Sequence, residues 1–205
     1  MPLAYYITDR HSGSLPILQH IQQAIDASVD LIQIREKDLA TQPLLELSSR
    51  ALELAKGSQS RVLVNDRVDV ALAGSLDGVQ LGHHSVRTDT VSKHLREKNL
   101  LVGASVHSMA EFLNAAAGGA SFVTLGPIFP TPSKSAYGPP LGLKLLEKVC
   151  QRASIPVLAL GGVGLENYRS CLSAGAAGIA AIRLFQTSEG LHGAVRSIHD
   201  FLPDR

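Results

Sequence analysis

Short apolar runs alternate along the whole chain with longer segments in which apolar residues recur every three or four positions. The short runs predict eight strands, over residues 4–9, 31–37, 61–66, 78–82, 101–107, 121–129, 156–163 and 178–184. The longer segments predict eight helices, over residues 15–28, 42–56, 68–73, 86–97, 109–118, 141–153, 165–174 and 189–202. Successive strands begin roughly 17 to 35 residues apart, which is the scale of a strand–helix unit.

Eight such units predict a single (β/α)8 TIM barrel that occupies residues 1–205 as one domain. No linker divides the chain, and glycines such as Gly175 precede predicted strands, where helices end. A doubly wound open sheet is the alternative architecture.

Composition narrows the classes of partner. The chain has 45% hydrophobic and 18% charged residues, and 19 basic against 18 acidic residues leave a formal net charge of +1. This balance predicts neither a nucleic acid nor a membrane as partner, whereas a small anionic ligand stays open. Cys150 and Cys171 have no metal-ligand spacing, so both are expected to be buried free thiols in a reducing, cytoplasmic setting. Neither an amino-terminal signal peptide nor a membrane span is predicted.

The second predicted strand carries unusual polarity. A period of two places Gln33, Arg35 and Lys37 on one face, and we expect that face to line the barrel interior. Two cations pointing inward require an anion, which an internal carboxylate such as Asp66 or the phosphate of a ligand would supply. The ligand is the preferred interpretation, because it needs no matching internal acid.

Other predicted strands also end in polar residues. Asn65 and Asp66 close the third strand, where a turn or a helix cap is the alternative use. Ser105 and His107 lie two residues apart at the end of the fifth strand, so they share a face. An acid/base role for His107 is favoured over that of a satisfied core histidine.

The last three strand ends predict phosphate binding. A loop over residues 126–140 contains Thr131, Ser133 and Lys134, which suit phosphate oxygens and predict a ligand clamp rather than a plain surface loop. The next two strands are followed by glycines and by an arginine, where barrels often bind a phosphate. The residues concerned are Gly161, Gly162, Ile182 and Arg183.

Taken together, these motifs resemble the thiamine phosphate synthase and thiazole tautomerase (TenI-type) superfamily, whose fold is a (β/α)8 barrel. The resemblance rests on residues 6–9 (YITD), 33–37 (QIREK), 65–69 (NDRVD), 77–82 (DGVQLG), 105–108 (SVHS), 126–134 (GPIFPTPSK) and 161–162 (GG). It implies that residues 33–37, Asn65, Ser105 and Lys134 bind a pyrimidine diphosphate. It also implies that residues 131–133, Gly162, Ile182 and Arg183 bind a thiazole phosphate.

The two branches of the superfamily differ in their use of metal. The synthase binds Mg²⁺ through two aspartates, of which one matches Asp66 and the other falls where this chain has Ser85. Replacing a carboxylate by a hydroxyl weakens a magnesium site. Arg183 is a second departure, because synthases usually carry a serine there.

These departures favour the thiazole tautomerase, which needs no cofactor. The resemblance implies that His107 moves a proton within a carboxylated dihydrothiazole phosphate, which becomes the aromatic thiazole. The alternatives are a magnesium-dependent thiamine phosphate synthase and a non-catalytic regulatory homologue. A homodimer is expected, because an apolar helical face is common on barrels of this kind.

Overall fold

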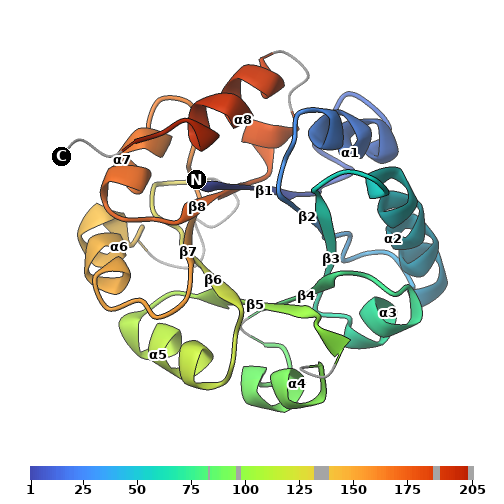
Figure 1. The fold of residues 1–205 in the computed structure, drawn as a ribbon, viewed down its shortest axis with the longest axis horizontal. Helices are drawn as coiled ribbons and strands as arrows, with labels where there is room; N and C mark the ends of the chain where they lie inside the picture. The colour runs from blue at the N-terminus through green and yellow to red at the C-terminus, as the bar shows by residue number, and fades with distance from the viewer. Residues whose placement is uncertain (83, 96–97, 132–138, 187–189, 203–205) are drawn as a thin grey trace.

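Eight parallel strands close into a barrel in the computed structural model of this chain. The structure describes residues 1–205 except 83, 96–97, 132–138, 187–189 and 203–205. Each strand pairs with its neighbour in chain order, and the first pairs with the last through Leu3 and Gly178, among other residues. Figure 1 shows the helices as an outer ring around the strands. Closure confirms the predicted (β/α)8 barrel and excludes the open sheet.

The observed elements follow the predicted ones closely. The strands are β1 (Leu3–Ile7), β2 (Leu31–Ile34), β3 (Arg61–Asn65), β4 (Gly78–Leu81), β5 (Leu101–Val106), β6 (Phe122–Leu125), β7 (Val157–Leu160) and β8 (Gly178–Ala181). The helices are α1 (Ile17–Asp26), α2 (Thr41–Ala55), α3 (Val68–Ala73), α4 (Thr88–Leu95), α5 (Met109–Ala117), α6 (Gly142–Cys150), α7 (Tyr168–Ser173), the 3₁₀ helix η3 (Arg183–Phe185) and α8 (Leu191–His199). All eight strands end before their predicted carboxyl ends, because the chain leaves the ladder there to build loops.

The end of β6 has a clear physical cause. Pro127 follows Gly126 and has no backbone N–H to donate to the ladder. The chain nevertheless stays beside the end of β7, because the Ile128 N–H donates to the Leu160 carbonyl at 2.9 Å and the Phe129 N–H to the Gly161 carbonyl at 3.0 Å. The loops after β6 and β7 are therefore packed together.

Two apolar layers hold the barrel. The outer layer lies between strands and helices and includes Ile21, Val64 and Leu146. The inner layer fills the space enclosed by the strands, the lumen, with Tyr5, Leu63, Phe122 and Leu158 among others. The rings of Tyr5 and Phe122 meet edge to face, with centroids 5.6 Å apart. The lumen is thus a packed core and no channel.

The two cysteines are free thiols, as predicted, but only Cys171 is fully buried. Cys150 at the end of α6 is half-buried. Burial raises the pKa of the Cys150 thiol to about 11 and that of Cys171 to about 12. Both thiols stay protonated at neutral pH.

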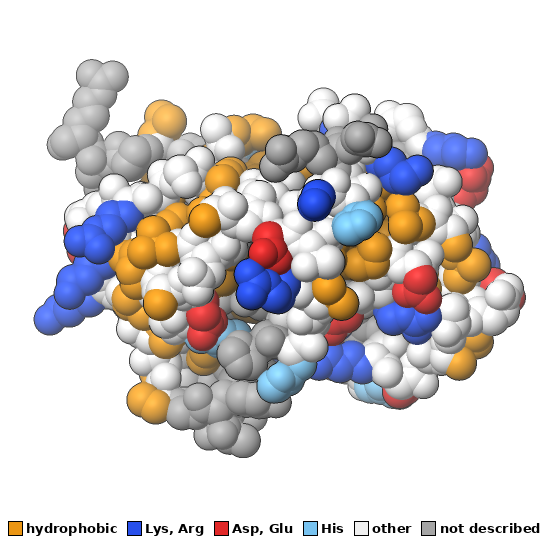
Figure 2. Space-filling view, turned by 90° about the horizontal axis from the view of Figure 1, so that it is seen from below, with side chains coloured by type: hydrophobic (Ala, Val, Ile, Leu, Met, Phe, Trp, Pro, Cys, Tyr) orange, Lys and Arg blue, Asp and Glu red, His pale blue; other side chains and the backbone are white. Residues whose placement is uncertain are grey.

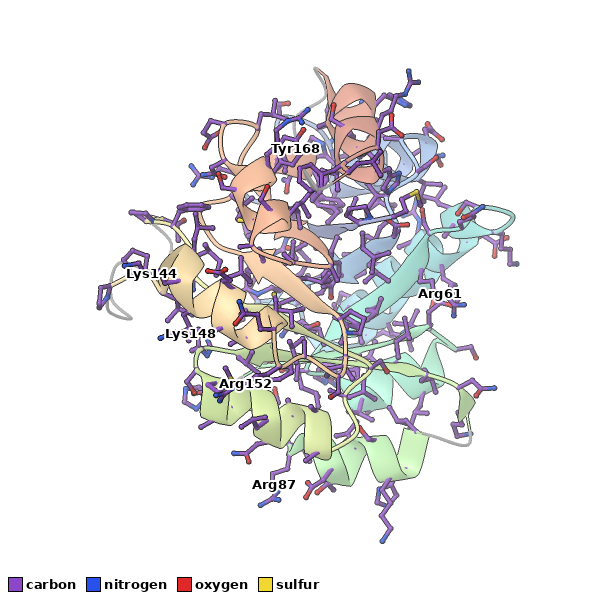
Figure 3. All side chains as sticks on the ribbon, turned by 60° about the vertical axis from the view of Figure 1, so that its left-hand side comes forward. Arg61, Arg87, Lys144, Lys148, Arg152 and Tyr168 are labelled. Carbon is purple, nitrogen blue, oxygen red and sulfur yellow. The ribbon has the colours of Figure 1, made fainter. Side chains whose placement is uncertain are left out.

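The surface agrees with the near balance of charge. Figure 2 shows Lys and Arg side chains beside Asp and Glu side chains at several places on one face. Lys144 and Lys148 of α6, and Arg152 just after it, lie on the outer ring of helices (Figure 3). Among the described residues, no helix combines the length and the apolar character needed to cross a membrane.

We predict that glycine is required at Gly178. A Cβ atom there would overlap the Leu3 carbonyl oxygen and lie 2.8 Å from Leu158, so Gly178→Ala should lower the free energy of unfolding by about 1–3 kcal/mol. Gly193 is the matched control, because a Cβ on this residue of α8 meets nothing within 4 Å. Gly193→Ala should raise the free energy of unfolding by up to about 1 kcal/mol. Urea unfolding measures both, and equal stabilities would contradict the prediction.

Candidate active site at the carboxyl ends of the strands

Most of the predicted site residues that the structure describes lie at one end of the barrel, the carboxyl rim, where all eight parallel strands end. Asn65 ends β3, Ser105 is the next-to-last residue of β5, and His107 directly follows β5. The loops after β2, β7 and β8 carry Arg35, Lys37, Gly161, Gly162, Ile182 and Arg183. Thr131 is described, whereas Ser133 and Lys134 lie outside the described residues.

The expected alternation along residues 33–37 is wrong. β2 ends at Ile34, so a period of two no longer applies to Arg35, which is half-buried, or to Lys37, which is exposed. Gln33 alone faces the lumen, where it is 2% exposed and donates through Nε2 to the Tyr5 hydroxyl at 3.0 Å. Only one of the three polar side chains therefore lines the barrel interior.

Glu36 is the buried charge of this segment, and sequence reasoning missed it. Its side chain is 4% exposed and accepts hydrogen bonds from the Thr8 hydroxyl at 2.6 Å and from the Arg10 N–H at 3.1 Å. The Thr8 hydroxyl oxygen also accepts from the Arg35 N–H at 2.9 Å. Glu36 thereby joins the ends of β1 and β2 and orients the backbone at Arg35.

Arg35 and Lys37 are not paired with any acid among the described residues. Glu36 accepts from Thr8 and Arg10, and Asp66 accepts from other groups described below. Within the described part of the chain, no Asp or Glu lies at ion-pair distance from Arg35 or Lys37. This arrangement removes the internal-carboxylate interpretation of these cations, which water can solvate because neither is fully buried.

Asp66 has a backbone conformation that is rare for a residue with a side chain. Its φ is 61°, in the left-handed region, and such strain is typical of functional positions. Its carboxylate accepts from the Asn65 amide at 2.8 Å, from the Gly82 N–H at 2.9 Å and from the Ser85 hydroxyl. Asp66 thus connects the ends of β3 and β4 and keeps an exposed carboxylate at the carboxyl rim.

Asp66 suits a magnesium ion that takes most of its ligands from substrate phosphates and water. Among the described residues, no group of three or more His, Cys, Asp or Glu side chains could hold a metal. Magnesium, however, usually binds through one or two carboxylates and takes its other ligands from substrate phosphates and water. Asp66 supplies one hard carboxylate, and Ser85 supplies a neutral hydroxyl beside it. The residues present therefore suit a magnesium ion that arrives with a phosphorylated substrate.

His107 is positioned by the first turn of α5. The Ser108 side chain caps this helix by accepting from the Glu111 N–H at 3.2 Å. The Glu111 carboxylate reaches back to His107 and lies 2.8 Å from its backbone N and 3.2 Å from its Nδ1. The spacing of Ser108 and Glu111 is that of a capping box, so the sequence contained a signal for Glu111 that was not used.

The glycines after β7 serve packing as well as backbone freedom. Gly161 and Gly162 have φ values of 91° and 66°. A Cβ on Gly161 would lie 2.6 Å from Pro127, and one on Gly162 would lie 2.6 Å from the Pro130 carbonyl oxygen. Both glycines are thus needed where the loops after β6 and β7 pack together.

The predicted end of the eighth strand is also wrong. β8 ends at Ala181, and Arg183 begins the 3₁₀ helix η3, with Ile182 as its N-cap. Arg183 is exposed at the rim, and Ile182 packs against the inner apolar layer. The apolar character of residues 182–185 comes from this short helix and not from a longer strand.

This fold and this rim define a class: a TIM-barrel enzyme whose carboxyl rim combines cations, a carboxylate and a histidine for a small phosphorylated substrate. A family model described as thiamine monophosphate synthase (TMP-TENI) matches residues 4–185. The chain belongs to this family and is an enzyme of thiamine biosynthesis.

Individual relatives agree with the family. The chain is 34% identical over 204 residues to the thiamine-phosphate synthase of Roseiflexus castenholzii, covering 99% of this chain and 89% of the relative. It is 34% identical over 200 residues to the thiamine-phosphate synthase of Pyrococcus furiosus, covering 98% and 94%. A solved structure, the thiamine phosphate pyrophosphorylase of Pyrococcus furiosus, superposes with a TM-score of 0.82 at 32% identity and covers 96% of each chain.

We predict opposite tautomers for two histidines. The Glu111 carboxylate can only accept, so neutral His107 should carry its proton on Nδ1. His199 is the matched comparison, because its Nε2 faces the Asp30 carboxylate at 2.8 Å and should carry the proton there. Long-range ¹H–¹⁵N NMR at a pH where both rings are neutral distinguishes the two forms. The same tautomer at both histidines would contradict this geometry.

Proposed function

We propose that this chain is a thiamine-phosphate synthase, which joins hydroxymethylpyrimidine diphosphate to thiazole phosphate and releases pyrophosphate. The observation that carries the proposal is that Arg35 and Lys37, after β2, and the exposed Asp66 carboxylate, after β3, follow neighbouring strands, and that neither cation has an acid partner among the described residues. A diphosphate with a divalent cation satisfies both charges at once. The names of the relatives support the synthase over the tautomerase that sequence reasoning preferred.

In this proposal residues at and just beyond the carboxyl ends of β2, β3 and β5 bind the diphosphate. Arg35 and Lys37 neutralise its charge, and Asn65 and Ser105 donate hydrogen bonds to its oxygens. In the reaction the carbon–oxygen bond to the diphosphate breaks, a carbon–nitrogen bond to the thiazole forms, and the diphosphate leaves with the electron pair. Magnesium, when bound, supplies positive charge that stabilises this leaving group.

The thiazole phosphate occupies the other half of the carboxyl rim. Gly161 and Gly162 turn the backbone after β7, and Ile182 and Arg183 lie after β8, where barrels often bind a phosphate. Arg183 is a cation where the family resemblance implies a serine, and it still pairs with a phosphate. Following the family resemblance, Thr131 and Ser133 are proposed to bind this phosphate and Lys134 the diphosphate, although Ser133 and Lys134 lie outside the described residues.

The Asp66 carboxylate should be essential for synthesis. Asp66→Asn keeps the size of the side chain but removes the negative charge, so we expect kcat/KM for thiamine phosphate formation in magnesium to fall about 10²-fold. Asp69→Asn is the matched control, because Asp69 is an exposed aspartate three residues away that pairs with Arg67. The assay measures thiamine phosphate by chromatography. Equal losses in both variants would contradict a special role for Asp66.

Ser85 offers a gain-of-function test of the same site. Ser85→Asp adds a second carboxylate beside Asp66, and we expect the magnesium concentration for half-maximal activity to fall about tenfold. Ser85→Asn is the control, because it adds an oxygen ligand of similar size without charge. An unchanged magnesium requirement in Ser85→Asp would show that the metal does not bind at Asp66.

Thiazole tautomerase activity is a second candidate, favoured by the pairing of His107 with Glu111. With its proton on Nδ1, the neutral imidazole presents a basic Nε2. In this candidate, His107 removes the ring proton of the carboxylated dihydrothiazole phosphate and returns a proton to the exocyclic carbon.

The two candidates separate in one pair of assays. The synthase predicts thiamine phosphate only with magnesium and pyrimidine diphosphate. The tautomerase predicts aromatisation in chelator, followed by ultraviolet absorbance, which falls at least about 10²-fold in His107→Ala. His94→Ala is the matched control, because His94 lies on the exposed outer helix α4. Chelator-resistant aromatisation without thiamine phosphate formation would overturn the synthase proposal.

A further inference from the structure

Five side chains from five strands form a hydrogen-bonded network across the lumen, directly below the carboxyl rim. We refer to it as the lumen network, and its members are Tyr5 of β1, Gln33 of β2, Gln80 of β4, Ser105 of β5 and Thr124 of β6. Four of the five are at most 2% exposed, and Ser105 alone is partly exposed, at the top. The network thus begins in the core and ends at the site.

The hydrogen bonds of this network form a chain in one direction, in which Gln33 donates to Tyr5, Tyr5 to Gln80 and Gln80 to Ser105. The Gln33 amide donates to the Tyr5 oxygen at 3.0 Å, and the Tyr5 hydroxyl donates to Gln80 Oε1 at 3.2 Å. Burial raises the pKa of Tyr5, so its hydroxyl keeps the proton that it donates. Because Gln80 Oε1 accepts, its Nε2 must be the end that faces Ser105 and Thr124.

The Ser105 hydroxyl therefore accepts two hydrogen bonds within the network. Its Oγ accepts from Gln80 Nε2 at 3.1 Å and from the Thr124 hydroxyl at 3.3 Å. A serine hydroxyl has two acceptor sites and one proton. With both acceptor sites used, Ser105 interacts with a further group by donating its proton.

We infer that Gln80 is a positioning residue that fixes the Ser105 hydroxyl as a donor toward an anionic oxygen of the substrate. This inference rests on the proposed function, because it takes the diphosphate as the ligand beside Ser105. A phosphate oxygen has only acceptor sites, so a hydroxyl locked as donor binds it well and disfavours ligand groups that donate. Gln80 thereby contributes to specificity without touching the ligand.

The surrounding core is shaped to hold the Gln80 amide in place. Gly103 faces it from β5, and a Cβ there would overlap Gln80 Oε1. The ring of Phe122 fills the remaining space beside Gly103. The amide has hydrogen-bond partners at both ends, and turning it over would place its Nε2 against the Tyr5 hydroxyl, whose proton would then lose its acceptor.

The test uses a double-mutant cycle with inorganic pyrophosphate and magnesium as the probe, measured by titration calorimetry. Gln80→Glu keeps the shape but cannot donate, so Ser105 must donate to it and is lost to the ligand. We expect Gln80→Glu and Ser105→Ala each to weaken pyrophosphate binding about tenfold or more, and the double variant to bind no more weakly than the weaker single variant. Gln59→Glu, an exposed loop residue, controls for the added charge.

Several outcomes would overturn the inference. The first is that the losses of affinity caused by the two substitutions multiply in the double variant, as for independent residues. The second is that Gln80→Glu binds pyrophosphate as tightly as the wild type does, and the third is that the wild type does not bind pyrophosphate. If Gln80→Glu does not fold by circular dichroism, Gln80→Met replaces it, because it also lacks the donor but carries no charge. Thiamine phosphate formation by the wild type is assayed in parallel. If the wild type forms thiamine phosphate but the two mutational effects multiply, the role of Gln80 is rejected and the proposed function stands. If the effects are coupled but no thiamine phosphate forms, the synthase proposal is rejected and the orientation of Ser105 by Gln80 stands.

Discussion

The hydrogen bond between the Tyr5 hydroxyl and the Gln80 amide oxygen joins β1 to β4 across the barrel lumen. The orientation of the Gln80 amide, and with it the hydrogen bonding of Ser105 at the carboxyl rim, depends on this contact. Polar groups buried in a lumen must find partners there, because water cannot reach them. Gln33, Ser105 and Thr124 complete the set, and each comes from a different strand. The same contact that satisfies the core therefore sets the hydrogen-bond direction of a serine at the carboxyl rim.

The rim itself is organised by carboxylates that bind backbone and hydroxyl groups rather than cations. Glu36 joins the ends of β1 and β2, Asp66 joins those of β3 and β4, and Glu111 joins β5 to α5. These acids bind groups other than Arg35 and Lys37, so in the proposed function both cations are available to a ligand. This arrangement is compatible with the diphosphate site that we propose.

The candidate site could be predicted in part. Asn65, Ser105 and His107 lie at strand ends where the pattern predicted them, because parallel strands in a barrel all end at one rim. Arg35 and Lys37 reach the same rim for another reason than predicted, since β2 has already ended at Ile34. The alternation rule failed there because the donors of Thr8 and Arg10 draw Glu36 inward. Those donors are more than 25 residues away in sequence.

The sequence by itself determined the order of strands and helices, the closed barrel and the family. Each strand–helix unit carries its own apolar pattern, and eight units of this length close on themselves. Only the tertiary structure decided which polar side chains meet, such as Tyr5 with Gln80 and Asp66 with Ser85. The physical reason is range: periodicity reports neighbours within one element, whereas these hydrogen bonds depend on how strands distant in sequence are placed when the barrel closes.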